Sequence, residues 1–471
     1  EVKVTEKRVF HIAGFIVVAL GCGLFTYQII LSDFMEEHQI NIRMFRPMES
    51  YQKYGGVLTF ARSVGYAVVK KPEGYTTAKV DQIIQEYEKK SANEQQSTAK
   101  QYPNIITVVN ETFADIKVLG DFKTNEDYMP YFHSLKKNCV TGYTYASIVG
   151  GQTANTEFEL LTGNTLGFLS AGTTAFQLYI HGQMPSLVSN LKAEGYSGNK
   201  AMHPFNPYNY NRPAVYKDFG FTDFIDKFDF PKNVKRVREY ISDEANVDRI
   251  ISEYEKNRKK IDQPFYMYNM TIQNHSPYDK DAANFKQPIK IESSKYDAEA
   301  NRYLNLIKYS DDSLKQLTSY FEKCKEPTII LFLGDHQPRL TDEFMNKITN
   351  GQYQTWSSEQ MMKRYQVPFG ICANYDIKEQ HIEKTSMNYI QSILTKTAGV
   401  KMTGYQRFLN EVRKEVPTIT SQGYWGKNGK FYQINDKGSP YYGIIQKYRM
   451  IQYNMMFDKK NRRDSFFEVS K

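Results

Sequence analysis

The stretch PTIILFLGDHQ, residues 327–337, joins a short apolar run to a polar triplet. Pro327 to Leu333 is continuously apolar rather than alternating, which predicts a strand buried on both faces of a parallel sheet. Gly334 permits a tight turn, and Asp335 with His336 offers one oxygen and one imidazole ligand to a divalent ion. The stretch therefore predicts a buried strand that ends at a metal site.

Other segments are also short apolar runs that predict buried strands. Pro103 to Asn110 (PNIITVVN) is short, apolar and β-branched, and Phe265 to Thr271 (FYMYNMT) and Pro368 to Ala373 (PFGICA) are further candidate strands. Helical patterns lie between them, at Gln177 to Glu194 and Asn301 to Glu322. This alternation predicts an α/β domain whose central sheet is largely parallel and flanked by helices.

Polar residues follow three of the candidate strands directly. They are Glu111, His275, Asp335 and His336. In a doubly wound sheet, ligands bind beyond the carboxyl ends of the strands, so we expect these four side chains to lie near one another. A lone acidic residue after a strand is more often a turn former or a helix cap. The prediction of a site therefore depends on all four residues together and not on any one of them.

A glycine turn precedes a helical pattern at residues 150–163, GGQTANTEFELLTG. A hydroxyl at the start of such a helix can be aimed at phosphorus, while the first backbone N–H groups favour an anion. Thr153 is the candidate nucleophile. The structural alternative is that Thr153 or Asn155 only caps the helix, with Thr156 and Glu159 as a partial capping box.

Two polar loops offer further donors. Residues 203–212 (HPFNPYNYNR) hold a His, an Arg, several amides and tyrosines and two prolines, and their donors suit phosphate and glycerol hydroxyls. Residues 273–278 (QNHSPY) place His275 where it could give or take a proton. An ordinary Asn- and Pro-rich surface loop is the alternative for the first.

The N-terminal part contains a long uncharged stretch, Val9 to Leu31, with no Asp, Glu, Lys or Arg over 23 residues. As a helix it reaches roughly 34 Å, enough to cross a bilayer. Basic residues precede it and acidic residues follow it: Lys3, Lys7, Arg8, Asp33, Glu36 and Glu37. We expect residues 1–31 to be a transmembrane segment with a cytoplasmic flank. A cleaved signal peptide is the alternative, although no A-x-A-like site follows.

The remaining organisation follows from composition. Residues 32–99 read as a juxtamembrane helical connector, 100–450 as the catalytic domain and 451–471 as a C-terminal tail. With 41% hydrophobic and 24% charged residues the chain is globular, and a net charge of +9 fits an anionic surface or substrate, with no nucleic acid expected. Cysteines 22, 139, 324 and 372 are widely spaced, so neither a disulfide framework nor a thiolate zinc site is indicated.

In chain order, five motifs resemble those of the lipoteichoic acid synthase family, within the alkaline phosphatase and sulfatase superfamily. They are PNIITVVNETF, GGQTANTEFELLTG, HPFNPYNYNR, QNHSPY and LFLGDHQP. The resemblance covers roughly residues 100–450 and implies a sulfatase-like sandwich fold. Two positions depart from the pattern: Thr112 stands where Ser is common, and Tyr210 stands where relatives carry Trp.

The resemblance also implies a site. Thr153 would be the nucleophile. One metal, Mn²⁺ with Mg²⁺ or Zn²⁺ as alternatives, would be bound by Glu111, Thr153, Asp335 and His336. Substrate would be held by His203, Tyr210, Arg212 and His275.

The implied reaction moves glycerophosphate from phosphatidylglycerol to an acceptor hydroxyl through a covalent intermediate on Thr153. The acceptor could be a glycerophosphate polymer, a glycolipid or a wall polysaccharide, and the site would lie at the outer face of the cell membrane. A phosphoethanolamine transferase, a phosphodiesterase and a catalytically silent wall-binding module are the alternatives. A true sulfatase is disfavoured, because no C/S-x-P-x-R sequence surrounds Thr153.

Overall fold

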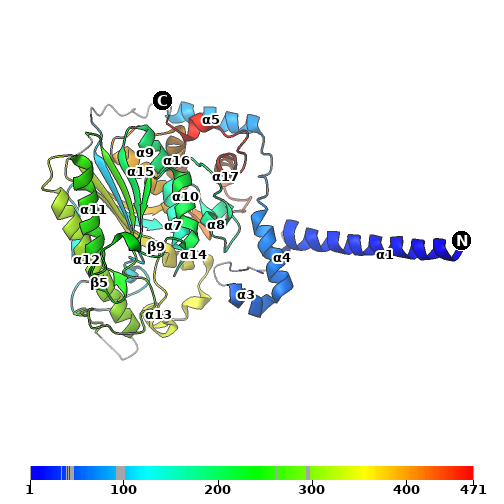
Figure 1. The fold of residues 1–471 in the computed structure, drawn as a ribbon, viewed down its shortest axis with the longest axis horizontal. Helices are drawn as coiled ribbons and strands as arrows, with labels where there is room; N and C mark the ends of the chain where they lie inside the picture. Colours follow the sequence, from blue (N-terminus) through cyan, green and yellow to red (C-terminus); the bar gives the residue numbers. More distant parts are fainter. Residues whose placement is uncertain are drawn as a thin grey trace.

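The run that ends in Gly-Asp-His forms a central strand of an eight-stranded sheet with the order β10-β2-β9-β8-β1-β7-β3-β4 (Figure 1). The strands are β1 (Asn104–Asn110), β2 (Cys139–Tyr145), β3 (Ser197–Met202), β4 (Asp223–Ile225), β7 (Phe265–Met270), β8 (Thr328–Gly334), β9 (Gln366–Ala373) and β10 (Gln380–Ser386). All neighbours pair in parallel except β9, which is antiparallel to both β8 and β2. The predicted largely parallel sheet is confirmed.

The computed structural model describes residues 2–469 other than 33, 39, 41, 43–46, 92–100, 260–261 and 293–297. Three parts of the sequence predictions lie outside the described residues: the flanking Asp33, the polar end of the expected connector, and the last two residues of the expected tail. All eight candidate site residues are described.

Strand β8 shows why its sequence is continuously apolar. Ile329 and Leu331 pack into the core on one face of the sheet, while Ile330 and Phe332 pack into the core on the other. A strand buried on both faces has no polar alternation. Gly334 is the last residue of the strand, and a Cβ atom there would lie 1.8 Å from the carbonyl oxygen of Phe113. The glycine therefore serves a close backbone approach.

Helices cover both faces of the sheet (Figure 1). Residues of α11 (Asp243–Arg258) and α12 (Ala298–Phe321) belong to one core. The other core includes residues of α7 (Thr153–Thr162), α15 (Met387–Thr397), α16 (Gly404–Glu415) and α17 (Tyr442–Met456). The last short helix, α18 (Asp464–Phe467), buries both of its phenylalanines in that second core. The C-terminal residues thus pack against the domain.

One predicted helix is wrong in its extent. Residues 177–194 do not form a single helix: α8 (Ala175–Leu178) and α9 (Leu187–Ala193) flank an irregular connection. Gly182 lies in that connection with a left-handed φ of 94°, and Ser186 begins α9 as its N-cap. A residue with left-handed backbone geometry ends an α-helix. The apolar periodicity of the sequence continues across this break, and for that reason it predicted one helix instead of two.

The expectation of no disulfide is also wrong. Cys139 on β2 and Cys372 on β9 are register partners in the antiparallel pair, their Cα atoms lie 4.2 Å apart, and they form a disulfide. The two residues are 233 positions apart in sequence, so spacing alone cannot reveal the pair. Cys22 and Cys324 are free thiols.

The N-terminal region is helical throughout most of its described length. The long helix α1 (Val2–Thr26) continues through a π-helical turn, η1 (Tyr27–Leu31), and the stretch Lys7–Ile30 is long and apolar enough to cross a membrane. It projects away from the body of the molecule (Figure 1). Four helices follow: α2 (Phe34–Glu37), α3 (Pro47–Tyr54), α4 (Gly56–Ala67) and α5 (Thr77–Ser91). Of these, α5 packs into the same core as α16 and α17.

Candidate active site

Three side chains that could hold a metal ion converge at the carboxyl ends of β1 and β8. Asn110 of β1 pairs with Gly334 of β8, so the residues that follow both strands emerge at the same edge of the sheet. There, one ligand atom each from Glu111, Asp335 and His336 lies within 4.8 Å of the others. All three residues are buried. The predicted meeting of these residues is therefore found in the structure.

Neighbouring groups orient these side chains toward a common point. His336 Nδ1 lies 2.9 Å from the carbonyl oxygen of Gln337, which fixes the proton on Nδ1 and leaves Nε2 as a ligand atom. Asp335 Oδ1 accepts hydrogen bonds from the backbone N–H groups of Thr112 and His336 at 2.6 and 2.8 Å. Glu111 Oε1 accepts one from the Thr112 hydroxyl at 2.8 Å.

The donor set fits a divalent cation. Within the described part of the chain, Asp335 Oδ2 and His336 Nε2 are buried without a hydrogen-bond partner, and they lie 3.2 Å apart. Burial, together with the negative charge of Asp335, raises the pKa of Glu111 to about 8. Buried carboxylates that are held so close together are normally paired with a cation. Two carboxylates and one imidazole suit manganese, magnesium or zinc.

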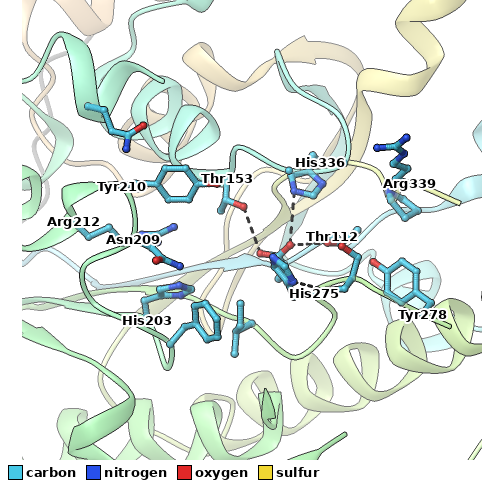
Figure 2. Close-up of a pocket in the computed structure, with 18 residues that line it drawn as sticks. Thr112, Thr153, His203, Asn209, Tyr210, Arg212, His275, Tyr278, His336 and Arg339 are labelled. Atoms are coloured by element: carbon cyan, nitrogen blue, oxygen red, sulfur yellow. Dashed lines mark hydrogen bonds and ion pairs between the residues drawn. The ribbon is translucent and has the colours of Figure 1, made fainter. Parts of the chain in front are cut away.

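Thr153 is the first residue of α7, and its hydroxyl points toward the same centre (Figure 2). The hydroxyl donates to Glu111 Oε2 at 3.5 Å. It does not cap the helix: the N-cap is Gln152, which makes no side-chain cap hydrogen bond. Thr156 instead donates to the carbonyl oxygen of Asp335 at 2.8 Å, and Glu159 accepts from Ser147 at 2.7 Å. The capping alternative is therefore wrong.

The turn before Thr153 is hydrogen-bonded to the loop that follows β8 and carries His336 and Gln337. Gly150 donates its N–H to the carbonyl oxygen of Gln337 at 3.0 Å. Its φ is +67°, and a Cβ atom there would lie 3.1 Å from the Cβ atom of Arg339. Gln152 also adopts a left-handed φ, of 66°, which is uncommon for a residue with a side chain. These constraints fix where the hydroxyl of Thr153 emerges.

A pocket of about 490 Å³ opens over this centre. The predicted substrate residues His203, Tyr210, Arg212 and His275 all line it, together with Glu111, Thr153 and His336. His203 and Arg212 lie on one side of the centre, and Tyr278 and Arg339 lie on the other (Figure 2). The roles assigned to these residues remain predictions, but their placement in one pocket is a property of the fold.

His203 follows β3 and is held in one tautomer. Its Nδ1 lies 3.0 Å from the carbonyl oxygen of Met270, so Nδ1 carries the proton and Nε2 is an acceptor. Burial lowers the pKa of His203 well below its ordinary value, and Arg212 lowers it further. A neutral His203 can accept a hydrogen bond from a substrate hydroxyl, but it does not supply positive charge.

Arg212 begins α10 (Arg212–Phe219) and is almost completely buried. Its Nε and Nη2 atoms donate to Oε1 of Glu157 at 3.0 and 2.7 Å, while Oε2 of Glu157 accepts from the hydroxyls of Tyr216 and Tyr268. The guanidinium carbon lies 5.1 Å from the ring centroid of Tyr210. The guanidinium is thus held on one side by Glu157 and on another by an aromatic ring.

Several pocket residues were not predicted from sequence. Thr112, Asn209, Tyr278 and Arg339 line the pocket. Glu157 does not line it but binds the pocket residue Arg212. Asn209, Tyr278 and Glu157 all lie inside the quoted motifs, so their positions in those motifs could have identified them as candidate site residues. For Glu157 that evidence was ambiguous, because Glu159 on the same helix is equally acidic and binds no cation.

Comparisons with known proteins agree with this geometry. A family model described as Sulfatase matches residues 103–400. A Rhizobium meliloti protein named putative cyclic beta-1,2-glucan modification protein is 30% identical over 433 residues, which are 90% of this chain and 65% of the relative. Lipoteichoic acid synthase-like YvgJ of Bacillus subtilis is 27% identical over 237 residues, which are 50% of this chain and 36% of the relative. The chain thus spans less than two thirds of either curated relative.

A solved structure shares the fold. The phosphoglycerol transferase GacH of Streptococcus pyogenes, in complex with sn-glycerol-1-phosphate, superposes with a TM-score of 0.68 at 21% identity, over 85% of this chain and 100% of that one. The family model, the relatives and the shared fold agree with the motifs. The chain belongs to the sulfatase family, in the alkaline phosphatase and sulfatase superfamily.

Proposed function

We propose that this protein is a membrane-anchored transferase that moves glycerophosphate from phosphatidylglycerol to an acceptor hydroxyl outside the cytoplasm. One observation carries the proposal. The hydroxyl of Thr153 points at the cluster of Glu111, Asp335 and His336, at the base of a pocket lined by Arg212. A nucleophile, a cation site and a phosphate-binding side chain therefore share one cavity.

Four residues would hold the metal: Glu111, Thr153, Asp335 and His336. Mn²⁺ is our first choice, and Mg²⁺ or Zn²⁺ would fit the same oxygen-rich donor set with one imidazole. When bound, the metal supplies a Lewis acid that lowers the pKa of the threonine hydroxyl and offsets the charge on the phosphoryl oxygens.

In the first half-reaction, Thr153 Oγ attacks the phosphorus of phosphatidylglycerol. The Oγ–P bond forms and the bond from phosphorus to the diacylglycerol oxygen breaks. The proton of Thr153 passes to that leaving oxygen by way of His275, whose Nδ1 lies 2.6 Å from the carbonyl oxygen of Ser276 and whose Nε2 is therefore free of the proton. Diacylglycerol leaves and glycerophosphate remains on Thr153.

In the second half-reaction, an acceptor hydroxyl attacks the same phosphorus. The new oxygen–phosphorus bond forms, the Oγ–P bond breaks, and the acceptor proton returns to Thr153 along the same route. Arg212 stabilises the phosphoryl oxygens in both steps, and neutral His203 accepts a hydrogen bond from a glycerol hydroxyl. The chain needs no further reactant.

The names of the relatives support the proposed transferred group and the reaction type. GacH is described as a phosphoglycerol transferase and binds sn-glycerol-1-phosphate, and YvgJ is named lipoteichoic acid synthase-like. The Rhizobium meliloti relative matches 90% of this chain and is named for the modification of a glucan. We therefore propose a saccharide hydroxyl as the acceptor, with a glycolipid or a glycerophosphate polymer as the alternatives.

Two features support a location outside the cytoplasm. The stretch Lys7–Ile30 contains an 18-residue apolar window with none of its residues buried, as expected for a membrane anchor surrounded by lipid rather than a buried core helix. The disulfide between Cys139 and Cys372 is typical of proteins that fold in oxidising compartments.

The deciding experiment incubates the purified membrane form with Mn²⁺, phosphatidylglycerol that carries a labelled glycerol headgroup, and candidate acceptors. We expect diacylglycerol as the lipid product and transfer of the label to a saccharide acceptor. Transfer of ethanolamine phosphate from phosphatidylethanolamine instead would identify a phosphoethanolamine transferase. Release of free glycerophosphate with every acceptor would identify a phosphodiesterase, and no turnover at all would favour a silent wall-binding module.

A further inference from the structure

Exposed apolar side chains are concentrated in one region of this molecule. Among the described residues, eighteen of the twenty large hydrophobic side chains that are exposed lie between Val9 and Val68. Twelve of the eighteen belong to the apolar helix and the short α2 that follows it, but six lie beyond them, five on α3 and α4 and one at Val68, the C-cap of α4. The apolar surface therefore continues past the end of the span.

The continuation is ordered on α4. Val57, Phe60 and Val64 are exposed at spacings of three and four residues, which places them on one helical face; Val57 is 76% exposed and Phe60 is 66% exposed. Val68, which is also exposed, is the C-cap residue of the helix. We call Val57, Phe60 and Val64 the apolar face of α4. Soluble surfaces carry single exposed hydrophobic residues, whereas a contiguous row needs a partner.

Lipid is the partner that the position of α4 favours. A Cβ atom at Gly65 would lie 3.4 Å from the Cα atom of Ile30, and Ala61 packs in one cluster with Ile29. Ile30 is the last residue of the apolar stretch, so α4 contacts the span where it leaves the hydrocarbon. Exposed lysines precede and follow α4 in the chain, at Lys53 and Lys70, and such residues favour an anionic membrane surface.

The opposite side of α4 is attached to the wall of the pocket. Tyr66 is buried, and its carbonyl oxygen accepts a hydrogen bond from the hydroxyl of Tyr179 at 2.9 Å. Tyr179 directly follows α8, which carries the pocket residue Gln177 and packs against η4 (Asn209–Asn211), where Asn209 and Tyr210 line the pocket. Figure 1 shows α4 between α1 and the body of the molecule, on the side of α8.

We infer that α4 is a membrane-surface helix whose apolar face lies among the lipid headgroups and upper acyl chains, and that it holds the pocket at a fixed height above the bilayer. This inference rests on the proposed function and deepens it. The donor would be taken from the bilayer surface itself rather than as a monomer from water, because the pocket wall and the membrane contact belong to one packed unit.

A fluorescence experiment tests the lipid contact without reference to activity. The full chain, with Cys22→Ala and Cys324→Ser to remove the free thiols, receives Phe60→Cys and an NBD label, and is reconstituted into phosphatidylcholine–phosphatidylglycerol vesicles. Ala78→Cys, an exposed position on α5, is the matched control. We expect blue-shifted emission at position 60, and about twofold or greater quenching by lipid with a doxyl group high on the acyl chain. Equal emission and quenching at 60 and 78 would overturn the inference.

A second experiment separates the inference from the proposed function. Val57→Asn, Phe60→Asn and Val64→Asn are combined, and turnover is measured with long-chain phosphatidylglycerol in the bilayer and with a short-chain, water-soluble phosphatidylglycerol. We expect an approximately tenfold loss with the bilayer donor and less than about twofold with the soluble one. Equal losses with both donors would overturn the inference. A wild-type protein that turns over neither donor would contradict the proposed function instead.

Discussion

Arg212 donates two hydrogen bonds, from Nε and Nη2, to a single oxygen of Glu157, at 3.0 and 2.7 Å. Both side chains are almost fully buried. Burial alone would lower the pKa of Arg212, but the charge of Glu157 more than offsets it, so the pKa of Arg212 is raised and the guanidinium stays charged. Within the described chain Nη1 makes no hydrogen bond, which leaves it for a phosphate oxygen. Glu157 is therefore a positioning residue for the group that binds phosphate.

We predict that Glu157→Gln raises KM for phosphatidylglycerol more than it lowers kcat. The amide keeps the shape of the carboxylate but loses the charge that fixes Arg212, and a charged hydrogen bond contributes about 1.5–3 kcal/mol. The expected loss in kcat/KM is about 10–100-fold. Steady-state kinetics with the lipid donor would measure it.

The matched control for that variant is Glu159→Gln on the same helix. Glu159 is also buried, and burial raises its pKa to about 7, but its partners are Ser147, Thr165 and the N–H of Leu166 rather than a cation. We expect Glu159→Gln to leave KM for the lipid unchanged. If both variants raise KM equally, Glu157 acts only as a structural residue.

Removal of the Thr153 hydroxyl should end the chemistry and keep the fold. The hydroxyl makes one long hydrogen bond, of 3.5 Å, so Thr153→Ala should change the melting temperature little. Loss of a nucleophile typically lowers kcat by about 10⁴-fold or more. Without acceptor, we expect wild type to gain the mass of one glycerophosphoryl group on Thr153, and Thr153→Ser to retain part of the activity. Normal turnover by Thr153→Ala would exclude the covalent intermediate.

Metal should stabilise the protein through the four buried residues that would hold it. At a hundredfold excess over Kd, a bound ion adds about 2.7 kcal/mol of unfolding free energy, or about 3 °C in melting temperature for a chain of 471 residues. We expect this increment with Mn²⁺ after chelator treatment of wild type, and its loss in Glu111→Gln. Without metal, Glu111→Gln should melt no lower than chelated wild type, because burial and Asp335 already disfavour a charged carboxylate at position 111, and the amide carries no charge. An unchanged Mn²⁺ increment in Glu111→Gln would contradict the assigned ligands.

The parts of the site that sequence could predict are those fixed by the strands. A strand buried on both faces has to be continuously apolar, so the sequence predicted where β1 and β8 end. It therefore also predicted that Glu111, Asp335 and His336 lie just beyond those ends. The pairing of Arg212 with Glu157 could not be predicted from the sequence, because the residues are 55 positions apart and the direction of the side chains on α7 depends on packing. A sequence alone shows which residues are charged but not which charges meet.

The disulfide should contribute stability without affecting catalysis. Cys139 begins β2 and Cys372 lies near the end of the antiparallel β9, at the sheet edge opposite the site. We expect Cys139→Ala with Cys372→Ala to lose about 2–5 kcal/mol of unfolding free energy, and to keep kcat at 25 °C. The free Cys324 gives the control, Cys324→Ser, which should change neither quantity. A double variant as stable as wild type would show that the thiols are not joined in the purified protein.

His133 should make stability depend on pH above neutrality. Its ring lies between two carboxylates, with Nε2 3.7 Å from Asp115 and Nδ1 hydrogen-bonded to Asp127 at 2.7 Å, and the interactions with Asp115 and then Asp127 raise the pKa of His133 to about 9. A folded pKa above the ordinary 6.5 stabilises the fold fully below about pH 6.5, and this contribution is lost as pH rises through about 9. The side chain is 35% exposed, so solvent screening reduces the expected contribution to about 1 kcal/mol. Urea unfolding of wild type and His133→Gln at pH 6 and pH 9.5 measures it. The difference in stability between the two proteins should shrink at the higher pH, and a difference that is independent of pH would show that His133 is not charged in the folded protein.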